Sequence, residues 1–134
     1  MILLLSFVGC DETIISRENN AEDIEDAQKQ AASLYKAIMT NDSTTLKFMC
    51  SNQVKWGDFS TLLTKLKAAN GEIKDVGNGL IKTKVTTRGK RKPLKYYEYE
   101  MKVNYSNGKT IDNFTFETQN DTLKLIGYHF KMDI

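Results

Sequence analysis

The fold of this chain is decided by residues 95–131, which read KYYEYEMKVNYSNGKTIDNFTFETQNDTLKLIGYHFK. Along 96–105, apolar and aromatic residues alternate with glutamate, lysine and asparagine, which is the two-residue period of a strand with one buried face. The pairs Asn107-Gly108 and Asn120-Asp121 have the composition of tight hairpin turns and divide the stretch into three strand-length pieces. The stretch therefore predicts an antiparallel meander of three strands.

The first turn predicts a register between two of these strands. A two-residue type I′ turn centred on Asn107-Gly108 places Met101 opposite Phe114. The same register places Tyr99 opposite Phe116. Both pairs join large apolar side chains across the strands, so the turn and the alternation agree on one buried face.

The second turn extends the buried face to the last strand. With Asn120-Asp121 at its centre, Phe116 is predicted opposite Leu125, and Asp112 opposite His129 on the same side. The reverse face then carries Ile126, Tyr128 and Phe130. The predicted core face consists of Tyr97, Tyr99, Met101, Val103, Tyr105, Phe114, Phe116, Leu123 and Leu125.

Upstream of the meander, the pattern is helical. Asn20 can cap a helix that runs to about Asn41, because acidic residues fill its first turns and small or apolar residues then recur at helical spacing. A short helix around Leu46 and a third helix from about Asp58 to Asn70 follow. Residues 72–87 are expected to be extended, with a turn or bulge at 77–79. Helices followed by strands predict an α+β fold, with helices on one face of an antiparallel sheet of about four strands.

The composition suits a single globular domain. The chain has 134 residues, of which 40% are hydrophobic and 27% are charged, as in ordinary soluble proteins. The net charge of +2 does not indicate a nucleic-acid partner. Charge is uneven, however, because residues 82–95 contain seven basic and no acidic side chains. Lys90, Arg91 and Lys92 form either a solvated loop or a contact with an anionic surface, such as phospholipid headgroups or an acidic glycan.

Residues 1–10 form an apolar segment that ends in Gly9-Cys10 and is too short to span a bilayer as a helix. It resembles the end of a bacterial lipoprotein signal peptide, in which a small residue precedes the cysteine that receives the lipid. The resemblance implies lipid attachment at Cys10 and a place in the bacterial cell envelope, on the periplasmic or the surface side. Residues 11–20 would then be a flexible tether, and 21–134 the single domain. The alternative is that the apolar segment packs on the domain.

Few residues suggest catalysis. His129 opposite Asp112 would form a general acid–base pair, or simply a hydrogen-bonded strand end. Cys50 lies in an apolar stretch, as expected for a buried thiol rather than a nucleophile. Sequence motifs for metal, nucleotide or other cofactor sites are not found in the chain. The side chains that either fill the core or line a ligand pocket are Trp56, Tyr97, Tyr99 and His129.

Four segments together suggest a family. They are 31–38 (AASLYKAI), 71–73 (GEI), 99–108 (YEMKVNYSNG) and 123–128 (LKLIGY). Their pattern resembles small bacterial lipoproteins of unknown function in the cystatin-like, or nuclear transport factor 2-like, superfamily. The resemblance covers about residues 25–130 and implies a cone in which a curved sheet wraps around a long N-terminal helix, often with a cavity between them.

Three functions remain open at this point. The first is a noncatalytic, membrane-tethered module of the cell envelope that binds a small molecule, a glycan or a protein. The second is a cavity-type enzyme that uses Asp112 and His129. The third is a structural lipoprotein that forms a homodimer through the sheet face bearing Ile126, Tyr128 and Phe130.

Overall fold

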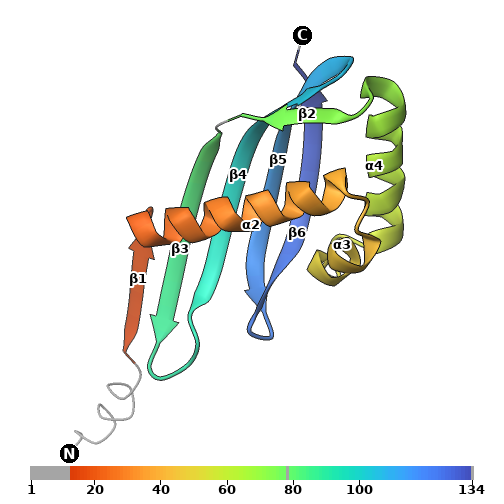
Figure 1. Ribbon diagram of the computed structural model, residues 1–134. Helices are drawn as coiled ribbons and strands as arrows, with labels where there is room; N and C mark the ends of the chain where they lie inside the picture. The colour runs from red at the N-terminus through yellow and green to blue at the C-terminus, as the bar shows by residue number, and fades with distance from the viewer. Residues whose placement is uncertain (1–12, 78, 134) are drawn as a thin grey trace, which may run out of the picture.

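The computed structural model describes residues 13–77 and 79–133, which form an α+β domain with three helices on a curved antiparallel sheet of six strands (Figure 1). Five strands follow the order β1-β3-β4-β5-β6, and β2 pairs with the far end of β4. The α+β class is confirmed, but the sheet has more strands than the four expected. In chain order the elements are β1 (Ile14–Glu18), α2 (Ala21–Met39), α3 (Ser43–Met49), α4 (Trp56–Asn70), β2 (Ile73–Val76), β3 (Leu80–Arg88), β4 (Leu94–Tyr105), β5 (Gly108–Gln119) and β6 (Thr122–Met132).

Helix α2 lies across one face of the sheet (Figure 1). Its N-cap is Asn20, whose side chain accepts a 3.0 Å hydrogen bond from the backbone N–H of Glu22. The buried stripe of the helix includes Ala31 and Leu34, and their spacing matches the helical period read from the sequence. None of the described helices is long and apolar enough to cross a membrane.

Strand β1 precedes α2, so residues 14–18 are part of the sheet and not of a flexible tether. β1 runs antiparallel to β3, with Ile14 opposite Arg88 and Glu18 opposite Lys84. Every residue of β1 is exposed, so the strand lacks the apolar alternation by which buried strands are recognised in a sequence. Backbone hydrogen bonds hold β1 in place, which a pattern of side chains does not reveal.

The turn between β4 and β5 lies one residue earlier than predicted, which shifts the register of the two strands by two residues. Tyr105 pairs with Gly108, so Ser106 and Asn107 form the loop, and Met101 lies opposite Asp112. A shift of two residues keeps every side chain on its predicted face. The reason is tertiary: the N–H groups of Ser106 and Asn107 donate 2.8 Å hydrogen bonds to carbonyls of residues 72 and 70 at the end of α4.

The turn between β5 and β6 is the predicted one, but a bulge follows it. Asn120 and Asp121 both have positive φ, and Phe116 lies opposite Leu125. The register then changes between Thr115 and Phe116, leaving Ile126 without an opposite residue. The extra residue reverses the faces of the rest of β6.

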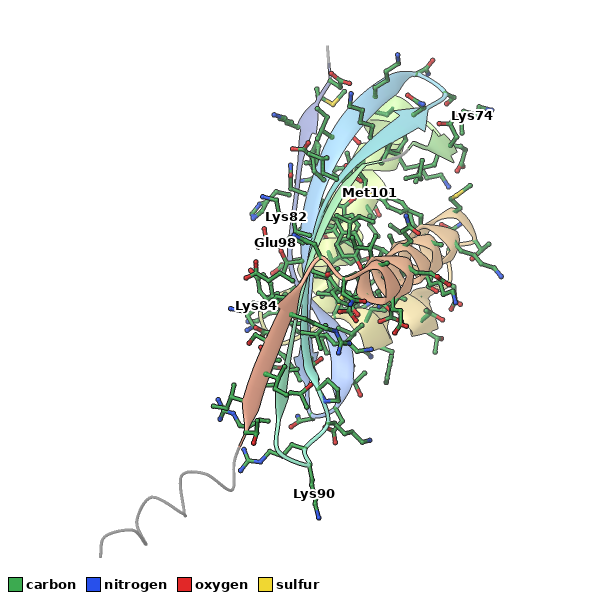
Figure 2. All side chains as sticks on the ribbon, turned by 90° about the vertical axis from the view of Figure 1, so that its left-hand side faces the viewer. Lys74, Lys82, Lys84, Lys90, Glu98 and Met101 are labelled. Atoms are coloured by element: carbon green, nitrogen blue, oxygen red, sulfur yellow. The ribbon has the colours of Figure 1, made fainter. Side chains whose placement is uncertain are left out.

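The core lies between α2 and the facing side of the sheet. Met101 points toward the helix, whereas Lys82, Lys84 and Glu98 point away from it on the outer face (Figure 2). Helix α4 closes one side of this core and ends at Gly71, which has a positive φ of 81°. The largest fully buried side chains are Tyr97, Phe116, Leu34, Leu125, Val85, Val103, Thr110 and Asp112.

Candidate functional site

The structure separates the predicted acid–base pair of Asp112 and His129. Because of the bulge in β6, His129 lies opposite Asn113, and Asp112 lies opposite Phe130. Asp112 is fully buried on the core face, whereas His129 is exposed beside a shallow groove between α4 and β6. The prediction of a joint acid–base site is therefore wrong.

Asp112 instead is the centre of a buried hydroxyl cluster. Its Oδ2 accepts hydrogen bonds from Tyr35 on α2 at 2.7 Å and from Tyr128 on β6 at 2.6 Å. Its Oδ1 accepts a 2.8 Å hydrogen bond from the hydroxyl of Thr110. Three donors from three elements thus satisfy one buried carboxyl group.

The phenols of this cluster stay protonated. Burial, together with the charge of Asp112, raises the pKa of Tyr35 and the pKa of Tyr128 well above their ordinary values. Burial also raises the pKa of nearby Tyr105 to about 12. Tyr35 and Tyr128 donate hydrogen bonds to Asp112, and the cluster connects α2, β5 and β6.

A pocket of about 200 Å³ lies where the end of α2 meets α3, α4 and β2. Its floor is apolar and includes Leu46, Leu66 and Ile73. At its rim, Lys67 and Glu72 form an ion pair at 2.9 Å. The complete lining is Ile38, Met39, Asn41, Ser43, Leu46, Trp56, Ser60, Leu63, Thr64, Leu66, Lys67, Gly71, Glu72, Ile73 and Tyr105.

Trp56 is the predicted ligand residue that the structure places on this pocket. It is the first residue of α4, is half-buried, and meets Phe59 edge-to-face with ring centroids 6.5 Å apart. Its ring is thus held by the helix while part of its surface remains open. This is the geometry of a side chain that can contact a small apolar ligand.

Tyr97 and Tyr99 belong to the core and do not line the pocket. The hydroxyl of Tyr97 donates a 2.6 Å hydrogen bond to Oδ2 of Asp26, and that of Tyr99 donates a 2.8 Å bond to the carbonyl of Ala27. Burial raises the pKa of both phenols. Their polar partners are thus supplied by α2, and both tyrosines hold this helix against β4.

Tyr105, which the sequence predicts on the core face of the meander, also lines the pocket. It is the last residue of the alternating row of β4, at the end of the strand, and it is half-buried. Its position at the end of an aromatic row was the one sign in the sequence that it could be partly open to a pocket. The helix that forms the opposite wall, α4, could not be placed beside it from the sequence.

Lys90, Arg91 and Lys92 are exposed on the loop between β3 and β4, and Lys90 lies at its tip (Figure 2). The Nζ of Lys92 is 4.0 Å from a carboxylate oxygen of Asp121 in the neighbouring turn. This end of the molecule is separate from the pocket, which lies along α4.

One of the two cysteines belongs to the part of the chain that the structure describes. Cys10 lies outside the described residues, and Cys50 is a half-buried free thiol whose pKa is raised by burial. Within residues 13–77 and 79–133, no group of three or more histidine, cysteine or acidic residues is placed to hold a metal ion.

Comparisons with protein families, with curated proteins and with solved structures find no match for this chain.

Proposed function

We propose that this protein is a noncatalytic binding module of the bacterial cell envelope, tethered to a membrane through Cys10. The observation that carries the proposal is the pocket between α2 and α4, which combines an apolar floor, an open tryptophan and a charged rim. Ligand sites commonly have this combination of apolar walls and a few polar groups.

The volume of the pocket limits the ligand class. A dry cavity of about 150 Å³ is large enough for a benzene molecule, and the pocket measures about 200 Å³. It therefore suits a single aromatic ring or a short branched aliphatic group. A polar or ionic end of the same ligand would meet Lys67 and Glu72 at the rim.

The test is titration with benzyl alcohol followed by backbone NMR shifts and by Trp56 fluorescence. Shifts concentrated on the lining of the pocket are expected. Ser60→Phe should fill the pocket and abolish them, because Ser60 lines it. Thr61→Phe is the matched control, since Thr61 is the next position on α4 and is exposed. Shifts that persist unchanged in Ser60→Phe would refute the pocket as the binding site.

The tether is tested separately by metabolic labelling with a clickable fatty acid. The proposal expects label on the wild-type chain and none on Cys10→Ala. Absence of label on the wild type, or label retained in Cys10→Ala, would refute the lipid anchor. The proposal that the pocket binds a ligand would be unaffected.

The homodimer through a face formed by Ile126, Tyr128 and Phe130 is not retained. The bulge turns Tyr128 toward the core, where only 8% of it is exposed. The three side chains therefore do not share one outer surface.

A further inference from the structure

We infer that the end of the sheet formed by β1 and the loop between β3 and β4 is a docking surface for an anionic phospholipid bilayer. Its cationic part is the loop with Lys90, Arg91 and Lys92, which reaches beyond the body of the sheet (Figure 2). Residues 82–95 contain no acidic side chain. Asp121 of the neighbouring turn lies 4.0 Å from Lys92, but the three basic groups of the loop outnumber it. An excess of basic groups at a protruding tip is complementary to a surface of anionic headgroups.

Exposed apolar side chains surround this basic loop. Ile14, Ile15 and Leu94 are 57%, 61% and 51% exposed. Ile14 pairs with Arg88, and Leu94 pairs with Thr86, so these two apolar side chains lie on the outer face of the sheet, on either side of β3. Apolar side chains next to basic ones are the combination that inserts into the headgroup region of a bilayer.

A backbone hydrogen bond just before β1 gives a second argument. The N–H of Gly89, in the basic loop, donates a 2.8 Å hydrogen bond to the carbonyl of Thr13. Cys10 is three residues earlier, so the covalent chain keeps it within about 11 Å of Thr13. This step rests on the proposed lipid anchor, which would emerge beside the basic loop and bring it to the same membrane.

This docking also orients the pocket. Leu94, beside the basic loop, is the first residue of β4, and Tyr105, which lines the pocket, is the last. A strand of 12 residues is about 40 Å long. With the basic loop on the bilayer, the pocket is thus held away from the surface and open to solution.

The first experiment measures sedimentation of the full chain carrying Cys10→Ser with vesicles of phosphatidylcholine, with and without phosphatidylglycerol. Binding is expected only with phosphatidylglycerol, and it should weaken in 1 M salt, where the Debye length falls to about 3 Å. Replacing Lys90, Arg91 and Lys92 by serine should weaken it on the order of 100-fold, since each basic group contributes about fivefold. Because no lipid is attached, this result is independent of the anchor and of the pocket.

The matched control removes the same charge at the opposite end of the sheet. Lys74, Lys109 and Lys131 are exposed there, and their replacement by serine should leave binding within about twofold of wild type. Equal binding to neutral and anionic vesicles, or equal losses in the two triple variants, would overturn the proposal. Binding of soluble polyphosphate without binding to vesicles would also overturn it in favour of a polyanion site.

A second readout locates the surface that meets the bilayer. In a Trp56→Phe background, tryptophan placed at Ile14 or Leu94 should be quenched by brominated lipids. Leu80→Trp is the control, because Leu80 is 66% exposed at the other end of β3. Quenching at Leu80→Trp equal to that at Ile14→Trp would exclude the inferred orientation.

Discussion

The phenol of Tyr35 donates a 2.7 Å hydrogen bond to Oδ2 of Asp112, which links α2 to β5 across 77 positions of sequence. Tyr128 donates to the same oxygen atom from β6. One buried carboxyl group therefore fixes the position of the helix relative to two strands. In a fold whose helix must lie across a sheet, such a link defines where along the strands the helix comes to rest.

Removing the carboxyl group should be far more damaging than removing one donor. Asp112→Ala leaves three buried hydroxyls without an acceptor and should lower the free energy of unfolding by about 3–5 kcal/mol. Tyr35→Phe removes one hydrogen bond and should cost about 1–2 kcal/mol. Urea denaturation followed by circular dichroism measures both. Thr45→Val is the control, because the Thr45 hydroxyl also donates a hydrogen bond to a carboxylate, but at an exposed site. If Thr45→Val lowered the free energy of unfolding as much as Tyr35→Phe, burial would not explain the effect of the Tyr35 hydrogen bond.

The ion pair at the start of α2 predicts a dependence of stability on acid pH. Arg17 donates two hydrogen bonds to Asp23, at 2.6 and 2.8 Å. These hydrogen bonds are the main reason why the pKa of the buried Asp23 carboxyl group is lowered. A pKa lowered on folding stabilises the protein above the unfolded value of about 3.9, and this stabilisation is lost as the pH falls through the folded value.

Asp23→Asn should therefore be less stable than wild type at neutral pH, and the difference should shrink at about pH 3. Urea denaturation at the two pH values measures this. Arg17→Gln should show the same reduced acid sensitivity, because it removes the hydrogen bonds that lower the pKa. A difference between wild type and Asp23→Asn that grows toward acid pH would contradict this assignment.

The bulge predicts that Ile126 can be deleted without unfolding the protein. Ile126 has no opposite residue on β5, so its deletion removes the bulge and leaves Leu125 and Tyr128 facing the core. We expect a loss of stability of about 1–2 kcal/mol and a folded amide NMR spectrum. Deletion of Glu100, an exposed residue in the regular ladder of β4, should instead unfold the chain, because it turns half of the strand to the wrong face. An equal loss of stability in both deletion variants would contradict this prediction, because it would show that the fold needs Ile126 at this position.

Alanine at two glycines near the opposite ends of α4 should change stability in opposite directions. Gly71 has a φ of 81°, and an added Cβ would collide with the hydroxyl of Ser106, so Gly71→Ala should cost about 1–3 kcal/mol. Gly57 lies in the first turn of the same helix with nothing near its Cβ position. Gly57→Ala should therefore stabilise the protein by about 0.5–1 kcal/mol. Thermal unfolding measures both, and stabilisation by Gly71→Ala would refute the strain at the helix end.

Sequence reasoning found the elements whose side chains carry a period. The stripe of α2 and the alternation of β4 predicted which residues face the core, and the positive φ of Asn120 and Asp121 follows the predicted turn. β1 was missed because an edge strand exposed on both faces has no apolar period. The general α+β class needed only these local patterns.

The remaining errors arose where contacts distant in sequence decide the geometry. The register of β4 and β5 depends on hydrogen bonds from the turn to carbonyls at the end of α4. The bulge at Ile126 could not be predicted, because a register counted from a turn assumes that every residue has a partner. That single extra residue moved His129 away from Asp112 and removed the predicted catalytic pair. Of the four residues expected to fill the core or line a ligand site, Trp56 lines the pocket, whereas Tyr97, Tyr99 and His129 do not. The walls of the pocket come from elements whose relative placement is a tertiary property.

The pairing of β1 with β3 has a mechanical consequence. β1 runs along β3 from Ile14 to Glu18, and the described chain begins at the end of this strand that lies beside the basic loop. A force that pulls on Thr13 along the strand axis loads the hydrogen bonds between β1 and β3 in shear, all at the same time. A force across the sheet would break them one after another. If the chain is held by this end, as the proposed lipid anchor requires, tension between the anchor and the proposed ligand acts on β1 in this shear geometry.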